Sequence, residues 1–312
     1  MSHDDAALVA EQLVWRDLRE QFPHALTALA SCLGSIEKGE TDPRARPAVA
    51  KELGAVSLVE AHRAWGQVSA VYAMRLAIER ATKSGVGIAI VRNSQTANAM
   101  GYYPTLAIKA GMVGLTVTNS EPYQPPWGGT TKVIGNQAWT YGAPALRNHP
   151  LLYDGSSTQI SMARIRDLER RGEPLPAGVA LDKAGDPTTD PAAVFTLLPS
   201  GGHKGYGLSV FWEVLTSALA DDALPEDSKR TSLFVMAIDP EASVGRARFM
   251  ATVDELIDRI HSSPPQAGVD RVTAPGERGY MTAAERAKTG IPIKAARMSE
   301  LAAIGKKYGV AW

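Results

Sequence analysis

The spacing of apolar residues along the chain predicts helices at both ends and between the strands. From residue 4 to residue 38, leucines recur at the three- and four-residue intervals of helix faces. Pro23 removes a backbone donor, so it should divide this stretch into two helices. The same periodicity predicts helices over residues 68–85, 103–111, 160–172, 251–263, 282–290 and 298–309, and an apolar, buried helix over residues 205–220.

Short β-rich runs occupy the middle of the chain. They span residues 87–94, 114–120, 132–145, 150–157 and 232–240, with a short strand pair expected within residues 41–66 and a surface loop over 173–194. Strands in the middle and helices at both ends predict an α/β fold. We expect a helical domain of residues 1–45 with 270–312, and a central α/β domain of residues 46–269.

Composition limits the partners and the compartment. Lysine plus arginine equals aspartate plus glutamate at 33 each, which lacks the excess of positive charge that nucleic acid binding needs. Cys32 is the single cysteine, so an internal disulfide or a cysteine-based zinc cluster is excluded, and a reducing compartment is expected. With no apolar run approaching eighteen residues, we expect a cytoplasmic protein with no membrane partner.

Two polar segments are candidates for binding a ligand. In LPSGGHKGYG (198–207), four glycines permit a close backbone approach and Lys204 adds a cation at a helix start, which suits phosphate; a tight turn with a surface lysine is the alternative. DGSST (154–158) places a carboxylate and three hydroxyls at a strand end, where ligands of α/β proteins bind; an ordinary turn or helix N-cap is the alternative. The six histidines are scattered and none is spaced for a helix-borne metal site, so no metal is expected.

Several motifs in one order resemble the malate/L-lactate dehydrogenase family. They are RNSQTANAMGYYPTLAIKAGMVGLTVTNSEPYQPPWGG, PLLYDGSST, RRGEPLPAGVALDKAGDPTTDPAAV, LPSGGHKGYGLS and PGERGYMTAAERAKTGIPI. The resemblance implies a mixed-sheet cofactor domain without a Rossmann fingerprint, a homodimer, and hydride transfer between NAD or NADP and 2-oxo acids or cyclic imines. The cofactor contacts that it implies are Leu152, Tyr153, Asp154, Gly155, Ser156, Ser157, Thr158, His203 and Lys204.

The catalytic segment departs from the family pattern. Members carry a stretch like R-G-x-D-S-H-G-x-x-R-x-x-R, and this chain has RDLREQFPHALTALAS. His24 keeps the position of the proton donor, and Asp154 is the partner expected to orient it. The preceding Asp-Ser is Phe22-Pro23, and Ala28 and Ser31 replace two arginines expected to hold the substrate carboxylate. Because neither side chain can replace a guanidinium fork, simple 2-oxo acids should bind poorly.

The expected substrate pocket is also altered. The family pattern R-N-S-N-H-F-G has become RNSQTAN, which places Gln95 and Thr96 where members have Asn and His, and G-T-N-P has become GNQA at residues 135–138. With Tyr102 and Phe22, these two side chains should line the pocket for an atypical small-molecule substrate.

Two functions follow from the retained and lost residues. The first is an NAD(P)-dependent oxidoreductase in which His24 donates or accepts the proton. The alternative is a relative that has lost redox chemistry and acts as an isomerase, a cyclase or a small-molecule binder. The sequence does not decide between NAD and NADP: Arg164 and Arg166 would suit a 2′-phosphate, but a solvated helix face explains them better.

Overall fold

The computed structural model describes residues 1–20, 26–222, 224 and 230–310. A seven-stranded mixed sheet forms its centre, in the order β1-β2-β3-β11-β4-β7-β8. Only β2 and β3 pair in parallel; the other neighbours are antiparallel. These strands are β1 (Ala48–Leu53), β2 (Val56–Glu60), β3 (Val86–Ser94), β11 (Thr231–Ile238), β4 (Val113–Thr118), β7 (Ala138–Ala143) and β8 (Leu151–Ser156).

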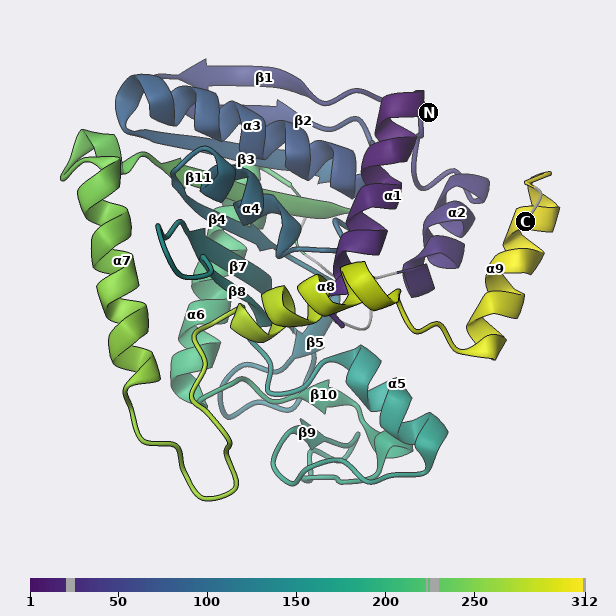
Figure 1. Ribbon diagram of the computed structural model, residues 1–312. Coiled ribbons are helices and arrows are strands. Elements are labelled where there is room, and N and C mark those ends of the chain that lie inside the picture. Colours follow the sequence, from purple (N-terminus) through teal and green to yellow (C-terminus); the bar gives the residue numbers. More distant parts are fainter. Residues whose placement is uncertain (21–25, 223, 225–229, 311–312) are drawn as a thin grey trace.

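Helices cover both faces of this sheet and its ends (Figure 1). They are α1 (His3–Leu18), α2 (Leu29–Glu37), α3 (Gly66–Ser84), α4 (Tyr102–Lys109), α5 (Met162–Arg171), α6 (His203–Glu213), α7 (Arg246–His261), α8 (Glu277–Thr289) and α9 (Ala295–Lys307). Short helical turns are η1 (Leu26–Ala28), η2 (Pro191–Ala193), η3 (Val214–Ala218) and η4 (Pro240–Ala242). Two small sheets pair β5 (Pro122–Gln124) with β6 (Ile134–Gly135), and β9 (Ala180–Leu181) with β10 (Thr196–Leu197).

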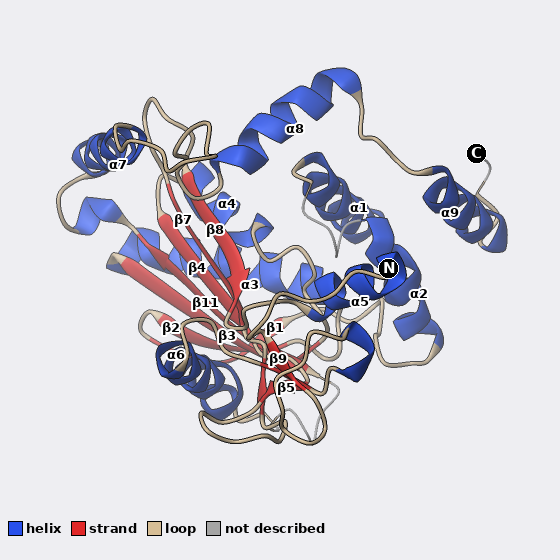
Figure 2. Ribbon diagram, turned by 90° about the horizontal axis from the view of Figure 1, so that it is seen from below, coloured by secondary structure: helices blue, strands red, loops and turns tan. Residues whose placement is uncertain are grey.

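The alternation of side chains in the central strands divides the core between two layers. Ala89 and Val91 of β3 face α3 and α4, whereas Ile88 and Ile90 face α6 and η3. Figure 2 shows α3 and α6 on opposite sides of the sheet. Met74 of α3 is fully buried in the first layer, and a side chain of this size contributes about 1.5–3 kcal/mol by burial.

Most of the predicted elements are present. The helix predicted to end at Gly85 does so, because Gly85 adopts the left-handed conformation (φ 77°) that terminates α3. The run predicted at 132–145 is instead two strands in different sheets. Between them, Gln137 has a positive φ of 37° and donates a hydrogen bond to Glu213, so the chain leaves one sheet for the other.

The predicted burial of the helix over residues 205–220 is wrong for its outer face. The segment is formed by α6 and the π-helical η3, with Trp212 turned into the core. Its other side leaves apolar side chains exposed, at Val210, Phe211, Val214 and Leu219.

Helices from the two ends of the chain lie side by side. The Arg286 guanidinium of α8 donates to the carbonyl oxygen of Asp17 at 2.6 Å and pairs with Glu20 at 3.0 Å. The predicted division into a helical domain and a central domain stays a prediction. Among the described residues, no helix is long and apolar enough to span a membrane.

Candidate active site

The two segments singled out from the sequence are joined by backbone hydrogen bonds. The Ser200 N–H donates to the carbonyl oxygen of Ser157 at 2.8 Å, and the Gln159 N–H donates to that of Leu198 at 3.0 Å. Thr158 and Pro199 form an isolated antiparallel bridge. The hydroxyl-rich segment after β8 and the glycine-rich segment before α6 are therefore directly joined, and the side chains of Ser157 and Thr158 are buried there.

Glycines shape the start of α6. Gly201 and Gly202 have positive φ values of 69° and 64°, and Gly202 is the N-cap of the helix. At Gly205, a Cβ would lie less than 3.0 Å from the carbonyl oxygen of Ser200, so only glycine lets the loop pass this closely. The first turn of the helix presents backbone N–H groups, which favour an anion.

His203 and Lys204 are the first two residues of α6, and both side chains are exposed. The His203 ring lies 6.0 Å from the ring of Trp127, whose side chain is itself 58% exposed. Within the described part of the chain, the Lys204 amine forms no ion pair. A cation, an imidazole and an indole thus gather at the helix start.

Gln124 holds the segments around this surface together. Its side chain is fully buried, and its amide donates to the Gly135 carbonyl oxygen at 2.6 Å and to the Ser157 hydroxyl at 2.8 Å. The same side chain exchanges hydrogen bonds with Ser209 of α6. The sequence offered no signal for this role, because an isolated glutamine at the end of a short strand does not reveal its distant partners.

Asp154 forms an ion pair with Arg16 from α1. The Arg16 guanidinium and the Asp154 carboxylate are 2.8 Å apart, and their side chains are only 12% and 10% exposed. Gly101 lies against this carboxylate, since a Cβ there would be 3.0 Å from Asp154 Oδ2 and 3.2 Å from the Trp15 ring. Sequence analysis missed Arg16. The predicted partner of Asp154, His24, and the predicted pocket residue Phe22 lie outside the described residues.

The remaining residues of the predicted cofactor strand are packed rather than free. Leu152 is buried, and its N–H donates to the carbonyl oxygen of Pro275 at 3.0 Å. Tyr153 stacks with Tyr141 and Trp139, at centroid distances of 5.5 Å and 4.4 Å. Burial raises the pKa of Tyr153.

The predicted pocket residues have different surroundings. Gln95 donates to the carbonyl oxygen of Glu40 at 2.8 Å, and Thr96 is exposed. Tyr102 is buried, and its hydroxyl donates to Glu11 at 2.8 Å. Burial and then this hydrogen bond raise the pKa of Tyr102, so its phenol is a neutral donor. Gln95 and Thr96 follow β3, whereas Tyr102 begins α4 and contacts the Trp15 ring edge-on at 5.7 Å.

In the described residues, no group of three or more histidine, cysteine, aspartate or glutamate side chains could hold a metal ion. The polar groups described at the site are the start of α6, the segment after β8 and the ion pair of Arg16 with Asp154.

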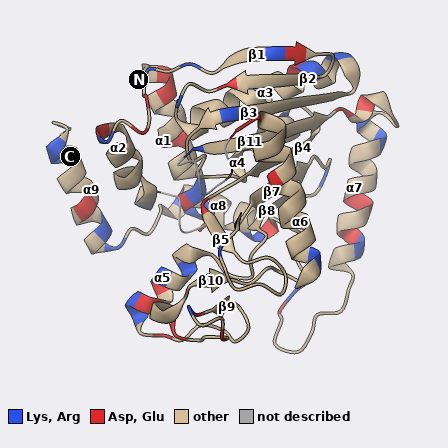
Figure 3. Cartoon of the chain, turned by 180° about the vertical axis from the view of Figure 1, so that it is seen from behind, with Lys and Arg blue, Asp and Glu red and all other residues tan. Residues whose placement is uncertain are grey.

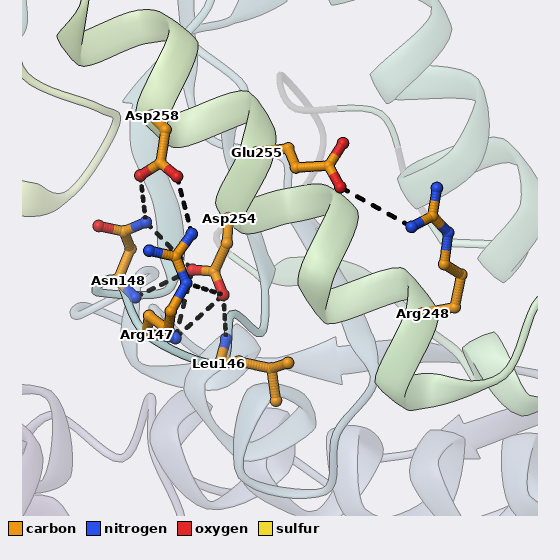
Figure 4. Close-up of polar contacts among 7 residues, drawn as sticks. All are labelled: Leu146, Arg147, Asn148, Arg248, Asp254, Glu255 and Asp258. Atoms are coloured by element: carbon orange, nitrogen blue, oxygen red, sulfur yellow. Dashed lines mark hydrogen bonds and ion pairs between the residues drawn. The ribbon is translucent and has the colours of Figure 1, made fainter.

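Asp254 of α7 fixes the loop that leads into β8. Its carboxylate accepts hydrogen bonds from the backbone N–H groups of Leu146, Arg147 and Asn148, at 3.1, 3.0 and 2.9 Å (Figure 4). Burial alone would raise its pKa, but these donors together hold the pKa below its usual value. The middle of α7 thereby helps to position β8, the strand predicted to contact the cofactor.

We expect Asp254→Ala to lower the free energy of unfolding by about 3 kcal/mol at neutral pH, because three backbone donors lose their acceptor. Asp254→Asn, the matched control, keeps one acceptor and should lose less. The pKa of Asp254 is lower in the folded protein than in the unfolded chain. The wild type should therefore be more stable than Asp254→Ala above the unfolded pKa of about 4, and this difference in stability should be lost as the pH falls through the pKa of Asp254 in the folded protein. Urea unfolding at neutral and acidic pH measures both effects; an advantage independent of pH would contradict this account.

Fold and site together define an α/β protein in which the loop before a glycine-bounded helix N-terminus is hydrogen-bonded to a hydroxyl-rich strand end. The sequence profile of the malate/L-lactate dehydrogenase family matches residues 1–302. Malate dehydrogenase of Pyrococcus abyssi is 32% identical over 324 residues, which cover 98% of this chain and 89% of that protein. Ureidoglycolate dehydrogenase (NAD(+)) of Escherichia coli K12 is 29% identical, with coverage of 94% and 87%.

Solved structures agree with these matches. The crystal structure of malate dehydrogenase from Entamoeba histolytica superposes with a TM-score of 0.94 at 26% identity, covering 100% of this chain and 93% of that one. The chain therefore belongs to the malate/L-lactate dehydrogenase family, which makes it a dehydrogenase or reductase by class. The predicted family and the predicted mixed-sheet α/β fold are both confirmed.

Proposed function

We propose that this protein is an NAD(P)-dependent oxidoreductase that acts on a carbonyl or imine carbon of a small-molecule substrate. The observation that carries the proposal is the direct connection of residues 157–159 with 198–200 beside the start of α6. Both segments were predicted to bind the cofactor, and they are far apart in sequence. Family membership supports a nicotinamide cofactor, because a relative's name includes NAD(+).

The residues at the start of α6 fit a dinucleotide. Gly205 lets the Ser200 carbonyl approach the first turn of the helix, whose backbone N–H groups favour a phosphate. Lys204, exposed beside them, adds a positive charge. When bound, the nicotinamide supplies or accepts the hydride. The part-exposed Ser156 hydroxyl would contact the cofactor. The Ser157 and Thr158 hydroxyls are buried and hold this segment in place by donating to the carbonyl oxygens of Asn136 and Ile160. His24 would move the proton to or from the substrate heteroatom.

The substrate is expected to be larger and less acidic than malate or lactate. Ala28 and Ser31 provide no guanidinium, and in the structure Ser31 lies exposed on α2. Phe22 would add an apolar wall. Turnover of malate, lactate or pyruvate that matches the best substrate of a screen would refute this part of the proposal.

Calorimetric titration with NAD, NADH, NADP and NADPH tests the proposal. We expect one reduced cofactor to bind in the micromolar range, followed by turnover in a screen weighted toward bulky carbonyls and imines. If none of the four nucleotides binds, the non-redox alternative with His24 as acid or base replaces it. The same titration decides between NAD and NADP, for which the exposed Arg164 and Arg166 are the candidate contacts to a 2′-phosphate.

We further propose that the protein is a homodimer. Val210, Phe211, Val214 and Leu219 form an exposed apolar stripe along α6 and η3. Figure 3 shows that α6 carries few charges, whereas charges of both signs recur along α5 and α7. Such a stripe supports burial against a second copy, and sedimentation analysis of the mass in solution measures it.

A further inference from the structure

Arg19, at the end of α1, lies against two aromatic rings. Its guanidinium carbon is 4.0 Å from the centroid of the Trp15 ring and 5.1 Å from that of Tyr280 on α8. The aliphatic part of its side chain lies close to Gly279, where a Cβ would be 3.6 Å away. Contacts with two aromatic rings restrict how this guanidinium can turn.

The hydrogen-bonding capacity of Arg19 is largely unused. Its one hydrogen bond to a described residue runs from Nη1 to the carbonyl oxygen of Trp15, at a long 3.4 Å. Its Nε is buried with no partner, and no carboxylate of the described chain forms an ion pair with it. Arg16 and Arg286, its neighbours in this region, each have a carboxylate partner. A half-buried cation without a counter-charge is costly, so an external anion is the expected complement.

Arg19 lies beside the candidate active site. It follows Arg16 by three residues, which places the two side chains on neighbouring positions of one helix. Arg16 contacts Asp154, and the Trp15 ring under the Arg19 guanidinium also lies beside Gly101, next to that carboxylate. Arg19 also precedes His24 by five positions in the sequence. A ligand on Arg19 would thus adjoin the residues expected to perform the chemistry.

We propose that Arg19 binds a carboxylate of the substrate, in place of the arginines that are absent at positions 28 and 31. This inference rests on the proposed oxidoreductase function. A guanidinium without a carboxylate partner can offer its N–H groups as a fork, which matches the two oxygens of a carboxylate. The cofactor phosphates are assigned to the start of α6, which leaves the substrate as the anion for Arg19. A substrate with a single carboxylate would need only one arginine, so it would fit Arg19 and would not require arginines at positions 28 and 31.

Oxalate and its neutral analogue oxamide are the probes for this site. We expect the wild-type protein to bind oxalate in calorimetry, with and without NADH. Arg19→Met should weaken oxalate binding by about 10- to 100-fold, the effect of losing one charge-assisted pair. Arg19→Lys should recover part of it, and binding of oxamide and NADH should not change.

Arg286→Met is the matched control, because it removes another contact between α1 and α8 and leaves Arg19 in place. It should reduce the melting temperature without a selective loss of oxalate. Equal oxalate binding by wild-type protein and Arg19→Met, or no oxalate binding by the wild type, would overturn the inference. So would weakened NADH binding in Arg19→Met, which would assign the guanidinium to a cofactor phosphate. If the protein binds oxalate through Arg19 but binds none of the nucleotides, the anion site is supported and the oxidoreductase proposal is refuted.

Discussion

Gly205→Ala is expected to remove detectable binding of the nicotinamide cofactor. The new Cβ would lie less than 3.0 Å from the carbonyl oxygen of Ser200, and this obstacle is rigid backbone rather than a flexible side chain. The loop must therefore shift away from the first turn of α6 and break the hydrogen bond from Ser200 to Ser157. Calorimetry with the reduced cofactor measures the loss, and circular dichroism checks that the fold remains.

Gly207→Ala is the matched control for this prediction. Gly207 lies two residues further along the same helix, and a Cβ there would meet nothing within 4 Å. Alanine favours a helix over glycine by about 1 kcal/mol, so this variant should be as stable as the wild type or more stable. Cofactor binding that survives in Gly205→Ala, or is lost equally in both variants, would show that the glycine-rich loop does not form the cofactor site.

His24→Ala is expected to reduce kcat by about 100- to 10,000-fold, the usual contribution of a positioned general acid or base. Nucleotide affinity should remain close to that of the wild type, because the proposed cofactor contacts lie on β8 and α6. Stopped-flow hydride transfer and cofactor calorimetry separate the two effects.

His3→Ala provides the comparison, since His3 is an exposed residue at the start of α1. It should leave both kcat and nucleotide affinity unchanged. Turnover that persists in His24→Ala would mean that the proton comes from another group, and the half-buried pair of Arg16 and Asp154 would be the next to test.

The sequence predicted the elements of this fold well, since each depends on local signals. Helical periodicity located α3 and α5, and turn residues marked the ends of β3, β4 and β8. The sequence predicted burial and the division into strands less well, because both depend on residues far away in the chain. The apolar segment at 205–220 has one exposed face, and the run at 132–145 divides between two sheets.

For the candidate site, the sequence by itself determined the family and the chemical character of two segments, DGSST and LPSGGHKGYG. Their motifs are local and glycine-dependent, so residue order alone reveals them. Only the tertiary structure decided that these segments are joined, that Asp154 is paired with Arg16, and that Arg19 lies over Trp15 and Tyr280 without a carboxylate partner in the described chain. Those contacts connect residues many positions apart. Because an ion pair or a ring contact depends on distance in space, which the order of residues does not specify, they required the folded arrangement.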